Sequence, residues 1–490
     1  MMSTTRLLPL GLMLLCFACA PPRDWYVDVN ADCLGSGTEQ DPFCTIRRAI
    51  DAANSGDTIL VRPGTYFEFI DFRGKDLVLK STHGPRHTII DGQSRGIVVR
   101  FESGETKASF LDGFTIQNGR NGRSNFGGGI FCDGSSPTIS GNWILDNKVG
   151  SALAFGGGIG CTETASPRIL KNWIARNVAH GNSSILAGGG FGGGIYAASP
   201  DTLILGNLIQ ENRAVDGSLV RNGKAIGGGI HALGCEIVNN TLVGNSVRAP
   251  HFIEDGSATY GADLVNCIVR ANSPSGPVEV STGTARFSCV PVGVDGPGNI
   301  QTSPEFLDIN QDDYRLACSS PCIDAGDDSV LSLLVDFEGN ARRVDGDSDG
   351  TSQIDIGAHE FDAEFRLIGL PISGGAPVRF GAQAPPGEAG NLAGVFLSLG
   401  DAAGGNGIVV PGSGGQRLNL DLDLFFGLWL NTPRVIRNMT LATCPEVAGA
   451  PFQIPSQVGP GTEVFYAGIT LDLTTGQVPS VTPTRSLIIQ

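Results

Sequence analysis

Gly127-Gly128-Gly129-Ile130 is the stretch that decides the fold of this chain, because it recurs three more times, at residues 156–159, 192–195 and 227–230. Each copy is followed by a second element with the pattern Asn-x-aliphatic-x-x-Asn. This element stands at residues 142–147, 172–177, 207–212 and 240–245, with a looser copy at 266–272. Self-similarity of this kind indicates a solenoid, a propeller or another repeat array.

The spacing of the repeats favours a parallel β-helix. Successive glycine triplets begin at residues 127, 156, 192 and 227, and the segments between them carry short aliphatic alternations such as Thr138-Ile139-Ser140 instead of a helical period. Helical solenoids are therefore excluded, and the blades of a propeller tolerate such unequal spacing poorly. A β-helix tolerates it well, because an insertion at a corner can loop out into solvent.

The asparagines of the repeat predict the corners of the coils. Asparagine readily adopts a left-handed backbone, which a sharp bend between strands requires, and its side-chain amide can bond the amide of the next coil. We therefore expect a ladder of stacked asparagines. The residue two positions later is expected to point into the core, where burial contributes about 1.5 to 3 kcal/mol per side chain. These residues are Ile144, Ile174, Ile209, Leu242 and Ile268.

The N-terminal part predicts a helix and an export signal. Residues 45–54 have the apolar spacing of an amphipathic helix, which is expected to cap the N-terminal end of the solenoid. Residues 1–20 resemble an export signal, with Arg6 before an apolar run that is too short to span a bilayer. The box that ends at Cys19 is similar to a bacterial lipoprotein box and predicts lipidation of that cysteine. Cleavage after Ala20 is the alternative.

The composition narrows the classes of partner. The chain has 490 residues, of which 17% are charged, and its formal net charge is −16. Because phosphate binding depends on clustered lysine and arginine, this balance disfavours a general nucleic-acid binder. Partners are expected to be neutral, or bridged to the protein by cations.

Twelve cysteines are typical of a protein in an oxidising compartment. Cys33 and Cys44 bracket a glycine-rich loop and are the best candidates for a disulfide. Cys132 and Cys161 take equivalent places in adjacent repeats, where strand spacing permits either a disulfide between coils or a ladder of two buried thiols. The sequence leaves the pairing of the later cysteines open.

Several sequence motifs carry a family resemblance. Residues 25–29, 42–50 and 56–66, together with the glycine triplets, resemble bacterial right-handed parallel β-helix proteins of the pectate-lyase-like superfamily. Residues 320–326, 336–342 and 355–360 resemble the tail called a choice-of-anchor Q domain. The resemblance implies an all-β fold and a surface location. Together with the signal segment at 1–20 and the capping helix predicted above, it divides the chain into a β-helix at 24–310 and a tail that closes the helix at 311–361. The composition changes near residue 362, and residues 362–490 are expected to form a C-terminal β-sandwich.

The residues that enzymes of this superfamily use are not gathered in the coils. The resemblance implies calcium-binding carboxylates with an Arg or Lys base for lyases, and paired aspartates for hydrolases. Acidic residues of the coils are scattered, and His231, Arg168, Lys171 and Arg176 are isolated candidates for acid–base work. We therefore expect a non-catalytic cell-surface protein that binds carbohydrate or another surface partner. The alternative is a secreted polysaccharide lyase or glycoside hydrolase.

Two tryptophans are the candidate binding residues. If Ile144 and Ile174 point inward, then Trp143 and Trp173 point outward, one coil apart, where they would form a flat platform for a sugar ring. The alternative is that both are buried under a corner loop. Insertions at residues 149–155, 178–191, 214–226 and 247–261 are expected to stack as loops on one side and to form the recognition edge.

A calcium loop is expected in the tail. The segment 345–355 carries carboxylates at alternate positions, with glycines that allow a tight turn; these are Asp345, Asp347, Asp349 and Asp355. A hard cation such as calcium needs several oxygen ligands from a short segment. The glutamate that would complete an EF-hand is missing, because Ile356 stands there. A structural calcium site and a merely acidic turn remain the two alternatives.

Overall fold

A computed structural model describes residues 21–361 apart from 123, 184–187, 219–222, 250–252, 273–277, 331–332 and 348–349. Beyond residue 361 it describes only the backbone of ten strands. The predictions for Cys19 and Asp349 therefore concern residues outside the described ones.

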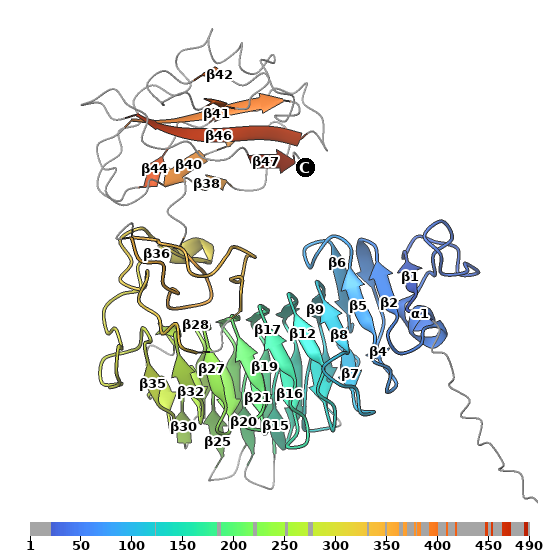
Figure 1. The fold of residues 1–490 in the computed structure, drawn as a ribbon. Helices are drawn as coiled ribbons and strands as arrows, with labels where there is room; N and C mark the ends of the chain where they lie inside the picture. The colour runs from blue at the N-terminus through green and yellow to red at the C-terminus, as the bar shows by residue number, and fades with distance from the viewer. Residues whose placement is uncertain are drawn as a thin grey trace, which may run out of the picture.

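Three parallel sheets form the body of the molecule (Figure 1). Each complete coil contributes one strand to each of them, and the two end coils add a strand to sheet A alone. Sheet A consists of β1 (Asp24–Val27), β2 (Thr58–Val61), β5 (Val78–Ser81), β8 (Phe110–Asp112), β12 (Thr138–Ser140), β17 (Arg168–Leu170), β22 (Leu203–Leu205), β27 (Glu236–Val238), β32 (Asp263–Val265) and β35 (Ala285–Arg286). Sheet B consists of β3 (Gly64–Tyr66), β6 (Thr88–Asp91), β9 (Thr115–Gln117), β13 (Trp143–Leu145), β18 (Trp173–Ala175), β23 (Leu208–Gln210), β28 (Thr241–Val243) and β33 (Ile268–Arg270). Sheet C consists of β4 (Ile70–Asp71), β7 (Val99–Phe101), β11 (Ile130–Cys132), β16 (Ile159–Cys161), β21 (Ile195–Ala197), β26 (Ile230–Ala232), β31 (Thr259–Tyr260) and β34 (Val280–Ser281).

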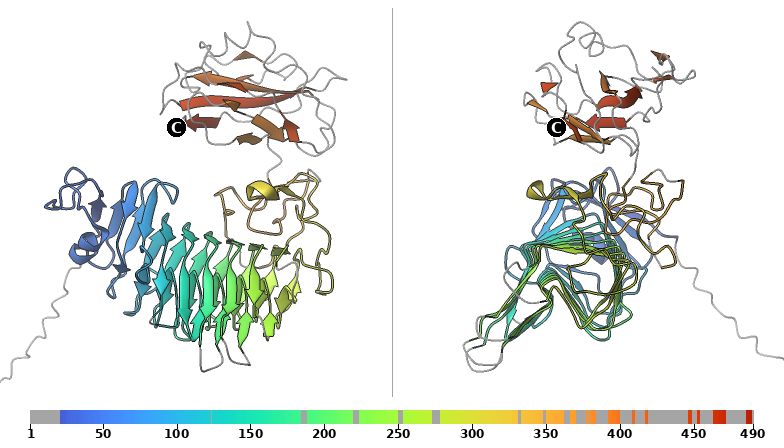
Figure 2. Two further views of the ribbon diagram at one scale, coloured as in Figure 1. Left: turned by 180° about the vertical axis from the view of Figure 1, so that it is seen from behind. Right: turned by 90° about the vertical axis from the view of Figure 1, so that its left-hand side faces the viewer.

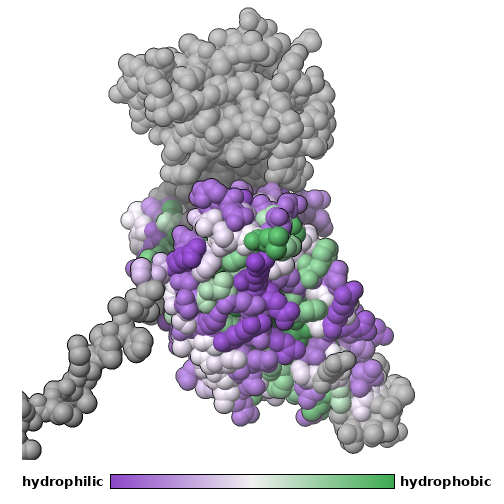
Figure 3. Space-filling view, turned by 90° about the vertical axis from the view of Figure 1, so that its right-hand side faces the viewer, coloured by the Kyte–Doolittle hydropathy of each residue, from purple (hydrophilic) through white to green (hydrophobic). Residues whose placement is uncertain are grey.

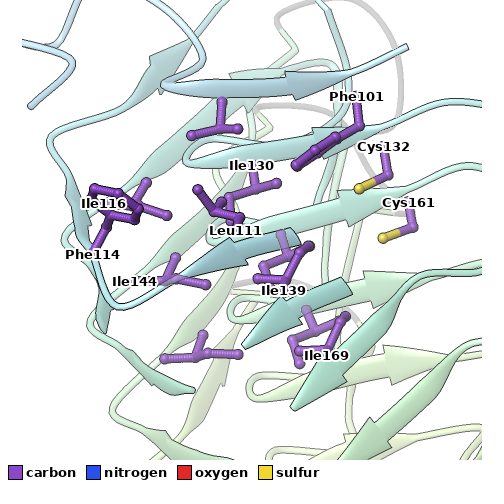
Figure 4. Packing of buried hydrophobic residues seen from close by; sticks show 14 of the residues in the cluster. Phe101, Leu111, Phe114, Ile116, Ile130, Cys132, Ile139, Ile144, Cys161 and Ile169 are labelled. Carbon is purple, nitrogen blue, oxygen red and sulfur yellow. The ribbon is translucent and has the colours of Figure 1, made fainter. Parts of the chain in front are cut away.

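Equivalent residues of successive coils lie directly over one another. Ile144 pairs with Ile174, and Ile174 pairs with Ile209, in parallel register. These inward side chains are fully buried and belong to one continuous core that runs along the axis of the coils (Figure 4). The expected parallel β-helix is therefore confirmed.

Two columns of buried asparagines connect the coils. One contains Asn142, Asn172, Asn207 and Asn240, and the other contains Asn147, Asn177, Asn212, Asn245 and Asn272. In each column the side-chain amide donates to the carboxamide oxygen of the next asparagine, at 2.9–3.1 Å. The predicted amide ladder is present.

We expected a left-handed backbone at the asparagine of each corner. The residue before the asparagine has this conformation instead. Lys171, Arg176 and Glu211 have φ angles of 51°, 56° and 52°, whereas Asn172, Asn177 and Asn212 do not have a positive φ. The bend falls one residue earlier, because the asparagine must keep its amide inside the column to reach the coils on both sides. Glycine takes the left-handed place at Gly141 and Gly206.

The prediction for the fifth coil is wrong by one residue. Thr241 pairs with Ile268 and Leu242 pairs with Val269, so Val269 takes the inward place. Cys267 replaces the asparagine of the first column, and its Sγ accepts from the Asn240 backbone N–H at 3.4 Å. Ile268 instead packs into a second buried cluster with residues of the tail.

The segments expected to be corner loops form two further parallel sheets, which together make a thin projection that we call the fin. Sheet D consists of β10 (Arg120–Asn121), β14 (Lys148–Ser151), β19 (Val178–Gly181), β24 (Arg213–Asp216) and β29 (Ser246–Arg248). Sheet E consists of β15 (Leu153–Phe155), β20 (Gly189–Phe191), β25 (Lys224–Ile226) and β30 (Ile253–Asp255). The right-hand view of Figure 2 looks along the coils and shows the fin leaving the body on one side. The expectation of one shared side is correct, and the expectation of loops is wrong.

Small side chains make the fin possible. Between sheets D and E lie Ala179, Ala214 and Ala225 with Val149 and Val247, all buried. These short side chains let the two backbones approach closely enough to bury each other without a wide core. These segments therefore form strands, because each one pairs with the equivalent segment of the next coil.

The glycine triplets form the root of the fin. A Cβ atom on Gly157 would lie 2.3 Å from the Gly193 carbonyl oxygen and 2.5 Å from the backbone of Val178. The first glycine of each triplet also has a left-handed backbone, with φ between 64° and 69°. Glycine is therefore required here by close backbone approach as well as by a turn.

The ends of the β-helix carry a helix and a tail. α1 (Ile46–Ala52) begins after Thr45, and its Ile46, Ala49 and Ile50 side chains join the main core beside β1, the first strand of sheet A. The tail includes β36 (Phe306–Asp308), the 3-10 helix η1 (Ile309–Gln311) and β37 (Asp313–Leu316). It bonds to the last coils, where the Ala358 N–H donates to Thr241 Oγ1 at 2.9 Å.

The strands beyond residue 361 pair antiparallel. They are β38 (Arg366–Gly369), β39 (Pro377–Val378), β40 (Phe380–Gln383), β41 (Leu392–Leu399), β42 (Ile408–Val409), β43 (Arg417–Leu418), β44 (Glu446–Ala448), β45 (Phe452–Gln453), β46 (Glu463–Leu471) and β47 (Arg485–Ile488). The C-terminal sandwich stays a prediction.

Candidate functional site

Seven rings fill the angle between sheet E of the fin and sheet C of the body, and we call this set the aromatic corner. Phe126, Phe155 and Phe191 each precede a glycine triplet, and their rings stack with centroid distances of 4.8 and 5.1 Å. The second set lies on the outer face of sheet C. It contains Phe131, Tyr196, His231 and Tyr260. Ring contacts of 4.7–6.0 Å connect it to the first set, and contacts of 5.1 and 5.0 Å join His231 to the two tyrosines.

Five rings of the aromatic corner are half-buried and reach solvent, namely Phe126, Phe155, Phe191, Tyr196 and Tyr260. Tyr196 and Tyr260 each carry a phenol hydroxyl, so the strip combines apolar ring surface with hydrogen-bonding groups. Burial, with a smaller effect of Glu163, raises the pKa of Tyr196. This phenol is therefore neutral at physiological pH and can donate a hydrogen bond.

His231 is a member of this stack and is poorly suited to be a catalytic base. It is 7% exposed and lies between Tyr196 and Tyr260, with ring contacts of 5.1 and 5.0 Å. Burial lowers the pKa of His231 to about 4, and no carboxylate contributes to the shift. Its Nδ1 atom has no hydrogen-bond partner among the described residues. The imidazole is neutral and packs as a ring.

Trp143 and Trp173 do point outward in register, but they do not form a flat platform. Their ring centroids are 5.1 Å apart and their planes are 86° to each other. The Trp173 indole N–H donates to Gln210 Oε1 at 3.0 Å, and the Arg86 guanidinium lies over the Trp143 ring. Strand alternation fixed the side on which the rings lie, but the neighbouring side chains fixed their orientation. Both rings are half-buried, between the two expected alternatives.

The three isolated cations considered as bases remain apart. Arg168 lies on sheet A, Lys171 at the bend after it, and Arg176 at the bend between sheets B and D. Arg176 donates two hydrogen bonds to Asp146, both at 3.0 Å, and this pairing raises the pKa of Arg176. A guanidinium held in its charged form this way is not a proton acceptor.

The acidic clusters of the described residues lie in the tail. One brings Asp336 and Glu338 beside His359, and the other brings Asp324 beside Asp345 and Asp347. In the first, Asp336 already accepts hydrogen bonds from the backbone N–H groups of residues 338, 340 and 360. Burial lowers the pKa of His359. These groups hold the tail together, and none borders the aromatic corner.

Asp355 does not belong to the expected calcium loop. Its carboxylate is fully buried and accepts from the backbone N–H groups of Asp324 and Phe361. Burial, together with the nearby Glu360 carboxylate, raises its pKa well above the usual range. Asp324 takes its place near Asp345 and Asp347, and it accepts from the N–H groups of Gly346 and Asp347 at 2.8 and 2.9 Å. Asp324 belongs to the motif at residues 320–326, about 20 residues before the expected calcium loop in the sequence.

The described cysteines comprise a disulfide near the N-terminus, the disulfide-bonded Cys318 of the tail, and six buried free thiols. Cys33 and Cys44 are joined, with their Cα atoms 4.8 Å apart. Cys132 and Cys161 are in register but free, so the disulfide alternative is wrong and the thiol ladder is correct. Side chains of in-register parallel neighbours point the same way, which keeps the two sulfurs side by side in the core (Figure 4). Cys289 and Cys322 form a second pair of free thiols within hydrogen-bond reach.

The surface has apolar and polar residues interspersed over the end seen in Figure 3. Within the described part of the chain, no helix is long and apolar enough to cross a membrane.

The sequence matches no protein-family model and no curated protein. Among solved structures, the chain is similar to the pectate lyase Pel9A, with 16% identity over 70% of this chain and 98% of that one and a TM-score of 0.31. A rhamnogalacturonan lyase matches with 13% identity over 54% of this chain and 74% of that one, at a TM-score of 0.26. A pectin methylesterase in complex with a hexasaccharide matches with 11% identity over 54% and 78% and a TM-score of 0.25. At these TM-scores the likenesses assign no activity, and the parallel β-helix rests on the paired strands themselves.

Proposed function

We propose that this chain is an exported cell-surface protein that binds a linear polysaccharide at the aromatic corner and does not cleave it. The observation that carries the proposal is the half-exposed strip of rings. Residues of successive coils supply these rings, so the strip runs along the axis of the β-helix. Aromatic side chains with a polar end suit ligands that have both apolar faces and hydroxyl groups. Sugars are ligands of this kind.

The form of the site favours a polymer over a small molecule. Ladder neighbours repeat about every 4.8 Å, so the rings present similar contacts at regular steps. Small ligands are usually held in concave pockets with a few convergent polar groups. The aromatic corner instead offers a strip in which Tyr196 and Tyr260 stand two coils apart.

Cleavage is disfavoured by the chemistry beside the rings. Acid–base cleavage needs groups within hydrogen-bond reach of the substrate, with pKa values near the working pH. The titratable imidazole of the corner, His231, is buried and neutral. Export and lipidation at Cys19 are part of the proposal and rest on the N-terminal sequence.

Binding assays with the full-length protein and a panel of neutral and acidic polysaccharides test the proposal. Tyr196→Ala should weaken binding by about 1 kcal/mol, or about fivefold, because one ring contact is lost. Phe67→Ala is the matched control, since Phe67 is 61% exposed and lies outside the corner. Equal binding by parent and Tyr196→Ala would remove the aromatic corner as the site. New reducing or unsaturated ends in the incubated polysaccharide would refute the non-catalytic assignment in favour of a lyase or hydrolase.

We also propose a structural calcium ion in the tail, held by Asp324, Asp345 and Asp347, whose carboxylates can offer ligand atoms within 4.8 Å of one another. Carboxylate oxygens are the ligands that calcium prefers. Added calcium should raise the melting temperature of the parent and leave that of Asp345→Asn unchanged. An equal response of both proteins would identify the cluster as an acidic turn only.

A further inference from the structure

The outer face of sheet D carries one basic residue from each of five successive coils. Strand alternation turns Val149, Ala179 and Ala214 toward sheet E, so their neighbours in the sequence face solvent. We call these five residues the basic stripe. They are Arg120, Lys148, His180, Arg213 and Arg248.

Acidic side chains are missing from this face of the described strands. The remaining outward positions of β14, β19, β24 and β29 are Gly150, Val178, Val215 and Ser246. Asp216 is the acidic residue of these strands, and it points inward, is 2% exposed and accepts from the Ser218 N–H. Such a face is unusual in a chain with a net charge of −16.

The charges of the basic stripe are not neutralised by neighbouring carboxylates. Among the described residues, no ion pair within 4.0 Å involves Arg120, Lys148, Arg213 or Arg248. The bend beside the stripe holds Asp146, which is paired with Arg176, and the exposed Glu211.

The basic groups instead act on one another. Burial lowers the pKa of Lys148, and the positive charges of Arg120 and Arg213 lower it further. Burial likewise lowers the pKa of His180, with added repulsion from Lys148 and Arg213, against a weaker opposing effect of Asp216. Repulsion within the stripe would be relieved by a bound anion.

The basic stripe continues into an open pocket at one end of sheet D. The pocket has a volume of about 450 Å³ and its lining includes Arg95, Arg100 and Arg120. Arg95 has no ion pair within the described residues, while Arg100 contacts Glu102 at 3.3 Å. The cationic surface is therefore longer than sheet D itself.

We propose that the basic stripe binds a linear anionic polysaccharide, with its carboxylate or sulfate groups aligned along the coils. Five rungs at about 4.8 Å span about 19 Å, so a chain lying along the axis meets one basic group at each step. Arginine, which supplies three of the five, pairs well with planar or branched oxyanions through its fork of N–H donors.

The surroundings favour a polysaccharide over the other polyanions. Single-stranded nucleic acid is usually held by aromatic side chains on which its bases stack, and the outward positions of sheet D hold no Phe, Tyr or Trp. The basic groups lie in two neighbouring register columns, with Arg120, Lys148 and Arg213 in one and His180 and Arg248 in the other. Two residues along a strand separate the columns by about 7 Å, and so narrow a strip matches a line of charges better than a plane of lipid headgroups. The site lies on the other face of the fin from the aromatic corner, so it does not depend on the proposed function.

A charge-neutralised variant of the full-length protein tests the proposal. The stripe variant combines Arg120→Gln, Lys148→Gln, Arg213→Gln and Arg248→Gln. The control combines Arg47→Gln, Lys107→Gln, Arg168→Gln and Lys171→Gln, which removes the same number of charges outside the fin. Binding to alginate, which carries carboxylates, and to heparin, which carries sulfates, is measured by calorimetry at fixed low salt. Each exposed ion pair changes affinity by about twofold to threefold, so the stripe variant should bind about thirtyfold more weakly.

A second variant separates charge from folding. Replacing Arg120, Arg213 and Arg248 by lysine keeps every charge, and it should retain most of the affinity for at least one probe. If the stripe variant loses more affinity for alginate than for heparin, carboxylates are the preferred groups. If it loses more affinity for heparin, sulfates are preferred. The proposal is overturned if the stripe variant and the control bind alike. It is also overturned if single-stranded DNA or anionic phosphatidylglycerol vesicles bind the stripe as tightly as either polysaccharide.

Discussion

Replacing Asn177 by alanine should lower the free energy of unfolding by about 4 kcal/mol. Asn177 is fully buried in the middle of its column. Its Nδ2 donates to the Ile144 carbonyl at 2.8 Å and to Asn212 Oδ1 at 2.9 Å. Its Oδ1 accepts from the backbone N–H and the side-chain amide of Asn147, both at 3.0 Å. Four hydrogen bonds at about 1 kcal/mol each give the total, and the Asn147 N–H is left without this acceptor in the core.

Urea denaturation followed by circular dichroism measures the change, with the slope of the transition checked for constancy. Asn182→Ala is the control, because Asn182 is exposed and stands outside both columns. Its effect should stay within about 0.5 kcal/mol. If Asn177→Ala were as mild as the control, the amide column would contribute nothing to stability beyond the strand pairing. The explanation of the repeat given above would then be wrong.

Three further outcomes are expected. Gly157→Ala should prevent the fin from packing and sharply reduce soluble yield, because its Cβ would meet backbone atoms at 2.3 and 2.5 Å. Gly150→Ala should leave the yield unchanged, because the nearest atom to its Cβ is a Lys148 side-chain carbon 4.0 Å away. Stability should fall as pH decreases from about 6.5 to about 4, because the folded protein keeps His231 neutral while the unfolded chain takes up a proton there. Urea titrations at several pH values should show a smaller fall in His231→Gln, and an equal fall would contradict the assignment. In mild urea that loosens the tail burying both thiols, oxidised glutathione should convert Cys289 and Cys322 to a disulfide with release of two glutathione thiols, since a hydrogen bond from Cys322 lowers the pKa of Cys289. Peptide mapping should find Cys132 still reduced, because burial raises its pKa.

The repeat was readable from the sequence because two strong local rules coincide in it. Glycine and asparagine at fixed offsets specify the bends and the amide columns, and the aliphatic residues between them specify the core. The same rules failed in the fifth coil. Asn266 matches the repeat pattern, but the next residue, Cys267, takes the place in the first asparagine column. A thiol in an amide column has no signature in a single sequence.

The fin was missed for a different reason. Most of its inner positions are alanine, glycine and valine in strands of two to four residues, and such short stretches resemble flexible linkers. A signal was nevertheless present in Phe126, Phe155 and Phe191, since each stands immediately before a glycine triplet. Recurrence at that position indicates a column of rings, whereas loops that only fill solvent would vary there.

The tail residues show what a single sequence leaves open. Asp345 and Asp355 look equivalent in the calcium pattern, but Asp345 is half-buried and Asp355 is fully buried beside Phe361 and Glu360. Long-range packing separated them. Similarly, alternation placed Trp143 and Trp173 outside without fixing the angle between their rings.

The in-register stacking has a consequence for how this molecule can change over generations. Because each middle coil gives one strand to each sheet, tandem duplication of a whole unit, such as residues 142–171, inserts a new layer whose neighbours already fit it. Growth of this kind lengthens both sides of the fin by one step and leaves the cross-section unaltered. The lengths of the aromatic corner and of the basic stripe can thus be adjusted by gene-level repeat number, without redesign of any single contact.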